Sequence, residues 1–114
     1  MRDPNCIFCK IASGDVKADV VHQDDDVVAF KDTNPKAPLH VLVIPREHIP
    51  SVADVPEPRL LGLLAQVAGR VARDAGYGRS GFRIVTNAGP DAGQSVFHLH
   101  FHVLAGRKLS WPPG

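Results

Sequence analysis

Residues 98–103 read HLHFHV, with His98, His100 and His102 alternating with Leu99, Phe101 and Val103. In an extended chain successive side chains point to opposite faces of a sheet. The three histidines therefore share one face, and the three apolar residues share the other, which can be buried. The pattern predicts a β-strand over these residues, with chemistry, a metal site or plain polar surface on its histidine face.

A metal ion bound by all three histidines of one straight strand would be strained. Alternate side chains lie about 6.6 Å apart along a strand, whereas zinc holds nitrogen ligands at about 2.0–2.1 Å. Two of the three can converge on one ion, so at least one is expected to do something else. A lone histidine here would suit an exposed edge strand, but three in register beside a glycine-rich loop favour chemistry.

That glycine-rich loop, NAGPDAGQS at residues 87–95, immediately precedes the histidines. Gly89 and Gly93 allow the backbone to turn its N–H groups inward as an anion-binding nest, and Gln94 and Ser95 add side-chain donors. An imidazole is largely neutral at cellular pH and attacks through one nitrogen while an acceptor holds the other. Together the loop and the strand indicate nucleophilic chemistry at phosphorus.

The composition describes one small globular domain over residues 1–114. The chain is 44% hydrophobic with a formal net charge of +1, so nothing predicts a nucleic-acid partner. There is no apolar run long enough to span a bilayer and no secretory leader. We therefore expect a cytoplasmic protein that binds neither nucleic acid nor membrane.

The only cysteines, Cys6 and Cys9, form a C-x-x-C motif. In a reducing compartment this spacing favours a metal clip over a disulfide. A closed zinc site needs two more ligands, and His22, His40, His48 and the three strand histidines are the candidates. The alternative is a pair of inert, buried thiols, and a redox pair is less favoured because no strand–helix unit surrounds the motif.

The remaining patterns predict an antiparallel α+β sheet. Residues 7–14 form a short helix closed by Gly14, residues 18–23 and 27–32 a hairpin, and residues 40–46 and 81–87 further strands. One long helix is expected over residues 58–75, capped by either Asp54 or Glu57 and followed by Gly76. Its apolar stripe comprises Leu60, Leu63, Leu64, Val67, Val71 and Ala75.

Three stretches resemble the histidine triad (HIT) superfamily. They are CIFCKI (6–11), AFKDTNPKAPLHVLVIPREHI (29–49) and GQSVFHLHFHVLAGRKLSWPPG (93–114). The terminal WPPG and the serine of GQS resemble the Hint branch, the purine nucleoside phosphoramidases, and C-x-x-C resembles its bacterial zinc-containing type. The resemblance implies a five-stranded antiparallel sheet with one long helix and a short N-terminal helix.

The resemblance also implies roles for individual residues. His100 would attack the α-phosphorus of a nucleotide, and Ser95 would assist the leaving amine. His40 would support the active-site histidines, and Asp32 would hold the ribose hydroxyls. Phosphate contacts are implied for Asn87, Gly93, Gln94, Ser95 and His102. The purine slot is implied for Ile7, Phe8, Ile11 and Phe30, each of which could equally be plain core.

For the metal, the resemblance implies that His48 and His98 join Cys6 and Cys9 around a structural zinc ion, which leaves His100 free. The implied activity is hydrolysis of the P–N bond of AMP-amine or GMP-amine compounds through a histidine–nucleotidyl intermediate. The alternatives are hydrolysis or phosphorolysis of dinucleoside polyphosphates, and a nucleotide-binding scaffold with incidental hydrolysis. A homodimer is implied, with the tail around Trp111 reaching the partner's site.

Overall fold

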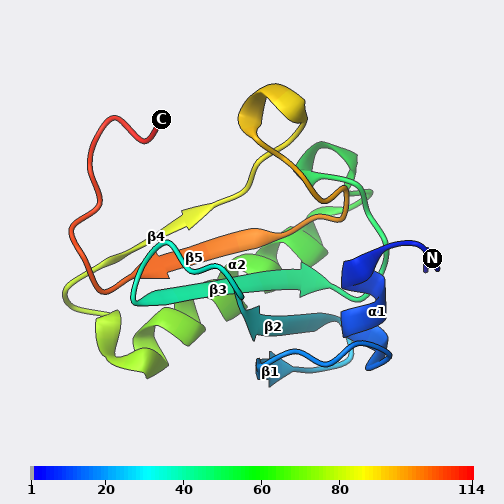
Figure 1. The fold of residues 1–114 in the computed structure, drawn as a ribbon, viewed down its shortest axis with the longest axis horizontal. Helices are drawn as coiled ribbons and strands as arrows, with labels where there is room; N and C mark the ends of the chain where they lie inside the picture. The colour runs from blue at the N-terminus through cyan, green and yellow to red at the C-terminus, as the bar shows by residue number, and fades with distance from the viewer. Residues whose placement is uncertain (1) are drawn as a thin grey trace.

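The computed structural model describes residues 2–114 and contains one antiparallel sheet in the order β1-β2-β3-β5-β4 (Figure 1). The strands are β1 (Val20–Gln23), β2 (Val27–Lys31), β3 (Leu39–Pro45), β4 (Phe82–Val85) and β5 (Phe101–Ala105). Two helices complete the architecture, α1 (Ile7–Ser13) and the long α2 (Pro58–Ala72). This confirms the predicted α+β class, with its five antiparallel strands, one long helix and one short N-terminal helix.

The two faces of the sheet bury different sets of side chains. Val41 and Val43 of β3 pack in the cluster beneath α2, together with Leu99 and Val103. Leu42, the intervening residue of β3, packs on the opposite face in a smaller cluster with α1. The period-two pattern of β3 thus divides the apolar core between the two helices, and the α1 face also carries the histidines.

The long helix begins at the expected Pro58 and reaches the expected Gly76, but its last turn is wider than a regular α-helical turn. Its start is capped by Glu57, whose carboxylate accepts hydrogen bonds from the backbone N–H groups of Arg59 and Leu60. Regular α2 ends at Ala72, and a wider helical turn follows to Tyr77, closed by Gly76 at φ 96°. The chain therefore stays helical to residue 75 as predicted, and only the placement of Ala75 in the buried stripe is wrong, because Ala75 is exposed.

The histidine strand also begins later than its sequence pattern predicts. Regular β5 starts at Phe101, so only His102 of the three histidines lies in it. The backbone groups before it are bonded elsewhere: Leu99 N–H donates to the Ile49 carbonyl at 2.6 Å, and the His100 carbonyl accepts from the Thr86 hydroxyl at 2.9 Å. The alternation nevertheless holds, because Leu99, Phe101 and Val103 all enter the core beneath α2.

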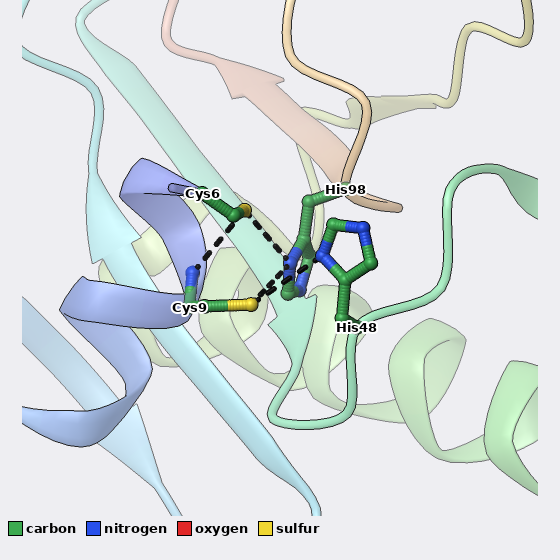
Figure 2. Close-up of side chains that lie close together, drawn as sticks. All are labelled: Cys6, Cys9, His48 and His98. Carbon is green, nitrogen blue, oxygen red and sulfur yellow. Dashed lines mark hydrogen bonds between the residues drawn. The ribbon is translucent and has the colours of Figure 1, made fainter. Parts of the chain in front are cut away.

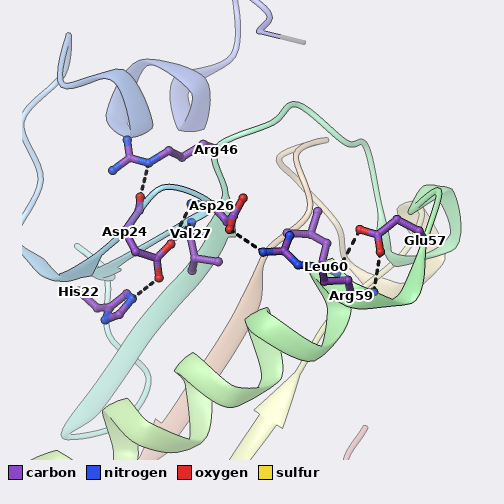
Figure 3. A network of polar contacts seen from close by, with 8 residues as sticks. All are labelled: His22, Asp24, Asp26, Val27, Arg46, Glu57, Arg59 and Leu60. Carbon is purple, nitrogen blue, oxygen red and sulfur yellow. Dashed lines mark hydrogen bonds and ion pairs between the residues drawn. The ribbon is translucent and has the colours of Figure 1, made fainter.

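Polar contacts around the β1–β2 turn fix both helices to the sheet (Figure 3). The guanidinium of Arg46 donates to the carbonyl of Asp24 at 2.7 Å and to the carbonyl of Ala12 at the end of α1. Arg59 of α2 lies 3.3 Å from the carboxylate of Asp26 in the same turn. The turn therefore holds α1 in place above the histidine face.

Among residues 2–114, the helices are all too short or too polar to cross a bilayer.

Candidate active site and metal centre

The Cys6, Cys9, His48 and His98 side chains converge at one point between α1 and the sheet (Figure 2). Cys6 is the N-cap of α1 and Cys9 lies in its first turn, so the i, i+3 spacing puts both thiols on one side of the helix. His48 follows β3, and His98 precedes β5. Of the three histidines of residues 98–103, His98 alone joins this cluster.

Distances within this cluster match a tetrahedral metal site. The Nδ1 atom of His98 lies 3.4 Å from Cys6 Sγ and 3.5 Å from Cys9 Sγ, and His48 Nδ1 lies 3.4 Å from Cys9 Sγ. Zinc–sulfur and zinc–nitrogen bonds of about 2.3 and 2.05 Å at a tetrahedral angle put sulfur and nitrogen about 3.6 Å apart. Two thiols and two imidazoles whose ligand atoms all lie within 4.8 Å of one another could therefore hold a metal ion.

Surrounding groups orient these four side chains. His98 Nε2–H donates to the Pro45 carbonyl at 2.8 Å, which leaves the Nδ1 lone pair facing the sulfurs. Burial lowers the pKa of His98 to about 4, so its imidazole stays neutral as a ligand must. Burial raises the pKa of the Cys9 thiol, so a thiolate here needs a cation beside it.

The nucleophile candidate, His100, has one nitrogen fixed and one free. Its Nδ1 lies 2.7 Å from the carbonyl oxygen of His98, so Nδ1 carries the proton and donates. The Nε2 lone pair is then available for attack. The edge of Phe8 packs against the imidazole with ring centroids 5.1 Å apart, and the residue is only 7% exposed. The tautomer expected for a nucleophilic histidine is therefore imposed by the backbone.

A second chain of hydrogen bonds fixes His40 and His102. The backbone N–H of Lys36 donates to His40 Nδ1 at 3.0 Å, so neutral His40 must carry its proton on Nε2. That Nε2 lies 2.9 Å from His102 Nδ1, which accepts and leaves His102 with Nε2–H as a donor. Burial lowers the pKa of His40, and burial lowers that of His102 to about 4.

This tautomer argues against a second metal centre. Asp32, His40 and His102 offer ligand atoms close enough to surround an ion. However, His40 Nε2 holds the proton that it donates to His102 and has no lone pair for a metal, because Nδ1 already faces a donor. The trio is therefore better suited to hydrogen bonding at an anion.

The histidines border an apolar pocket of about 670 Å³ between α1 and the strands β2 and β3. Its polar lining includes His100, His102, Ser95 and Asp32. The apolar lining includes all four residues proposed for a purine slot, Ile7, Phe8, Ile11 and Phe30. Phe8 and Phe30 meet edge to face at a centroid distance of 5.6 Å, so two of these side chains are both wall and core.

The glycine-rich loop is built differently from the expectation. Gly89 and Gly93 do adopt positive φ values of 87° and 90°. The Gln94 side chain, however, is 5% exposed and turns inward: its amide donates to the carbonyls of Pro50 and Val96, and its oxygen accepts from Gly89 N–H. Gln94 thus holds the loop shape instead of offering a free side-chain donor, and exposed Ser95 offers its hydroxyl at the pocket.

Sequence reasoning assigned no role to several residues that build the site. The Lys36 N–H sets the tautomer of His40, and the Thr86 hydroxyl holds the carbonyl of His100. Asn87, for which the resemblance does imply a phosphate contact, lines a second hollow together with Asp32, His40 and His102. A backbone donor leaves no mark in the residue letters, so only the folded chain reveals the first contact.

A family model for the HIT domain matches residues 13–109. The chain belongs to the HIT family. An uncharacterized HIT-like protein of Synechocystis sp. is 51% identical over 110 residues, 95% of this chain and 96% of that protein. A HIT family hydrolase of Legionella pneumophila superposes with a TM-score of 0.93 at 43% identity, covering 96% of this chain and all (100%) of the other.

A second solved relative is a histidine triad protein of Clostridium difficile. It has a TM-score of 0.92 at 44% identity and covers 96% of this chain and 97% of its own. These matches confirm the HIT superfamily and its fold over nearly the whole chain. The Hint branch and the zinc-containing type remain proposals for this HIT protein.

Proposed function

We propose that this HIT protein is a nucleotide-binding hydrolase that cleaves the P–N bond of purine nucleoside 5′-phosphoramidates. Solved relatives bear the name HIT family hydrolase, which supports hydrolysis in general. The observation that carries the finer proposal is His100: its Nδ1–H is held by a carbonyl, and its residue borders a pocket that has an apolar slot and a carboxylate.

The pocket supports a nucleoside monophosphate as the bound unit. A purine ring fits the apolar end, where Phe8 and Phe30 form the wall. Asp32 follows β2, and its two oxygens can accept from both ribose hydroxyls. His102 Nε2–H, Asn87 and the backbone around Gly93 then serve the phosphate. Lys31 and Thr33 also line this pocket, and they leave the choice between adenine and guanine open.

The proposed reaction has two displacements at phosphorus. His100 Nε2 forms a bond to the α-phosphorus while the P–N bond breaks, and the amine leaves with the bonding pair. The Ser95 hydroxyl assists by passing a proton to that nitrogen, with replacement from solvent. Water then attacks the phosphorus, the bond to His100 breaks, and the nucleoside monophosphate departs. One water is consumed and His100 returns to its starting form.

We also propose a structural zinc ion held by Cys6, Cys9, His48 and His98. The sulfur–nitrogen distances and the donor set described above support it. When bound, such a four-coordinate ion supplies a cross-link and no open position for water. Two free thiols that serve a metal suit a reducing compartment, which supports a cytoplasmic location.

A symmetric homodimer through α2 and the edge strand β4 is the assembly we propose. On β4, Phe82 and Ile84 are 37% and 38% exposed, and Phe82 borders a hollow of about 390 Å³ lined by Ala65 and Gly69 of α2. Self-pairing there would cover an exposed edge. Trp111, 80% exposed in the tail, is available to the partner. Light scattering that gives a monomer at micromolar protein would contradict the dimer.

Turnover of AMP-amine, GMP-amine and diadenosine polyphosphates, compared side by side, tests the function. We expect the P–N compounds to be hydrolysed fastest, and we expect His100→Asn to abolish turnover while AMP still binds. Faster turnover of the polyphosphates would favour that alternative. Near-normal turnover by the His100→Asn variant would contradict the mechanism, and AMP binding without any turnover by the wild type would favour a scaffold.

A further inference from the structure

A second hollow adjoins the apolar pocket at His102. It has a volume of about 520 Å³ and shares Asp32 and His102 with the first pocket, so the two hollows meet where the phosphate is proposed to sit. The first pocket accounts for the nucleoside. Asp32, Asn87 and His102 of the second hollow already serve the proposed function, but its remaining lining has no part in that function.

The lining of this second hollow is cationic. It contains Lys36 from the β2–β3 loop, Arg83 from β4 and Arg107 from the segment after β5, against the single carboxylate of Asp32. Among residues 2–114, none of these three cations forms an ion pair with a carboxylate. Three cations that share one concavity with a single carboxylate leave an excess of positive charge, which favours an anion as ligand.

Two of the cations are held in place by the chain itself. Arg83 donates to the Ser110 carbonyl at 2.8 Å, and Arg107 donates to the Lys36 carbonyl at 3.0 Å. A guanidinium has five N–H donors in a rigid fork, so each arginine keeps donors for a ligand. The Lys36 ammonium lies near enough to His40 to lower its pKa, after the larger effect of burial.

We propose that this hollow is the leaving-group site and that it selects amines that carry an anionic group, a carboxylate or a phosphate. The inference rests on the proposed function, because the leaving group is the amine released when the P–N bond breaks. The nucleoside occupies the apolar pocket, the phosphorus lies at His100 and His102, and the anionic amine extends toward Lys36, Arg83 and Arg107.

The test compares three AMP phosphoramidates of similar size: one whose amine bears a carboxylate, its neutral methyl amide, and one whose amine bears a phosphate. We expect kcat/KM to be about three- to tenfold higher for either charged compound than for the amide, the range of one or two partly exposed charge-assisted contacts. The preference should shrink as ionic strength rises. The rank order of the two charged compounds shows whether the hollow prefers a carboxylate or a phosphate.

Lys36→Gln should reduce the preference, which is the ratio of kcat/KM for a charged compound to kcat/KM for the neutral amide, to less than half. Lys108→Gln is the matched control, because Lys108 lies next to Arg107 yet does not border the hollow. Because an indirect effect on His40 would change kcat/KM for both kinds of substrate, it cancels in the ratio of kcat/KM for the charged compound to kcat/KM for the neutral amide.

Equal kcat/KM for charged and neutral compounds would overturn this inference and leave P–N hydrolysis standing, as would an equal response to both lysine variants. If none of the three compounds is hydrolysed, the proposed function fails first.

Discussion

Removal of the proposed zinc ion should destabilise the fold by an amount that the structure allows us to estimate. The ion would join Cys9 to His48, 39 residues away, and to His98, 89 residues away. In the chain-entropy model, a cross-link that closes a 39-residue loop is worth about 4 kcal/mol. The same figure follows from mass action when free zinc exceeds its dissociation constant about 1,000-fold.

The fold itself should survive the loss, because the core beneath α2 does not include the cluster. We therefore expect the zinc-free protein to melt cooperatively, with a midpoint about 15 °C lower at about 4 °C per kcal/mol for a chain of this size. The assay is thermal unfolding before and after a chelator, with the metal content measured by mass spectrometry.

Two variants sharpen this measurement. Cys9→Ala should purify without zinc, melt like the chelated wild type, and show no response to chelator. His22→Ala is the control, because His22 is a surface imidazole that pairs with Asp24 outside the cluster. It should keep both the metal and the chelator response. A wild-type protein that loses its metal to the chelator and keeps the same melting midpoint would refute the reasoning.

Two further outcomes follow from the site. Burial lowers the pKa of His102 to about 4, below the value of about 6.5 expected in the unfolded chain. Between these two pH values only the unfolded chain takes up the proton. The contribution of His102 to the free energy of unfolding should therefore be complete above about pH 6.5 and decrease as the pH falls toward 4. Urea titrations of Cys9→Ala and of Cys9→Ala/His102→Gln test this, because the Cys9 substitution keeps metal release out of the comparison. The free energy of unfolding should depend less steeply on pH in the double variant. Equal slopes would argue that His102 titrates normally. Gln94→Leu should cost about 1–3 kcal/mol of stability and weaken AMP binding, because Gly89 N–H and two carbonyls lose their buried partner. Unchanged urea midpoint and AMP affinity would show that the loop is held by other contacts.

The sequence by itself determined the features that depend on local periodicity. Alternation over residues 98–103 put the apolar side chains in the core, and the spacing of Cys6 and Cys9 put both sulfurs on one side of a helix. The glycines of the loop adopt the left-handed backbone that a side chain would resist. Each of these outcomes follows from backbone geometry over a few residues, which residue identity controls directly.

Tertiary structure alone decided which groups meet. Spacing alone left six histidines as candidate partners of the two thiols, and only the resemblance to a known family pointed to His48 and His98. The folded chain brings both to Cys9, and the His98 carbonyl then holds His100. The residue letters do not show that Gln94 turns inward, that Lys36 N–H fixes the protons of His40 and His102, or that Arg83 and Arg107 border one hollow. These contacts join residues far apart in the chain, and several run through backbone donors and acceptors that every residue carries. Their partners are therefore chosen by the path of the folded chain.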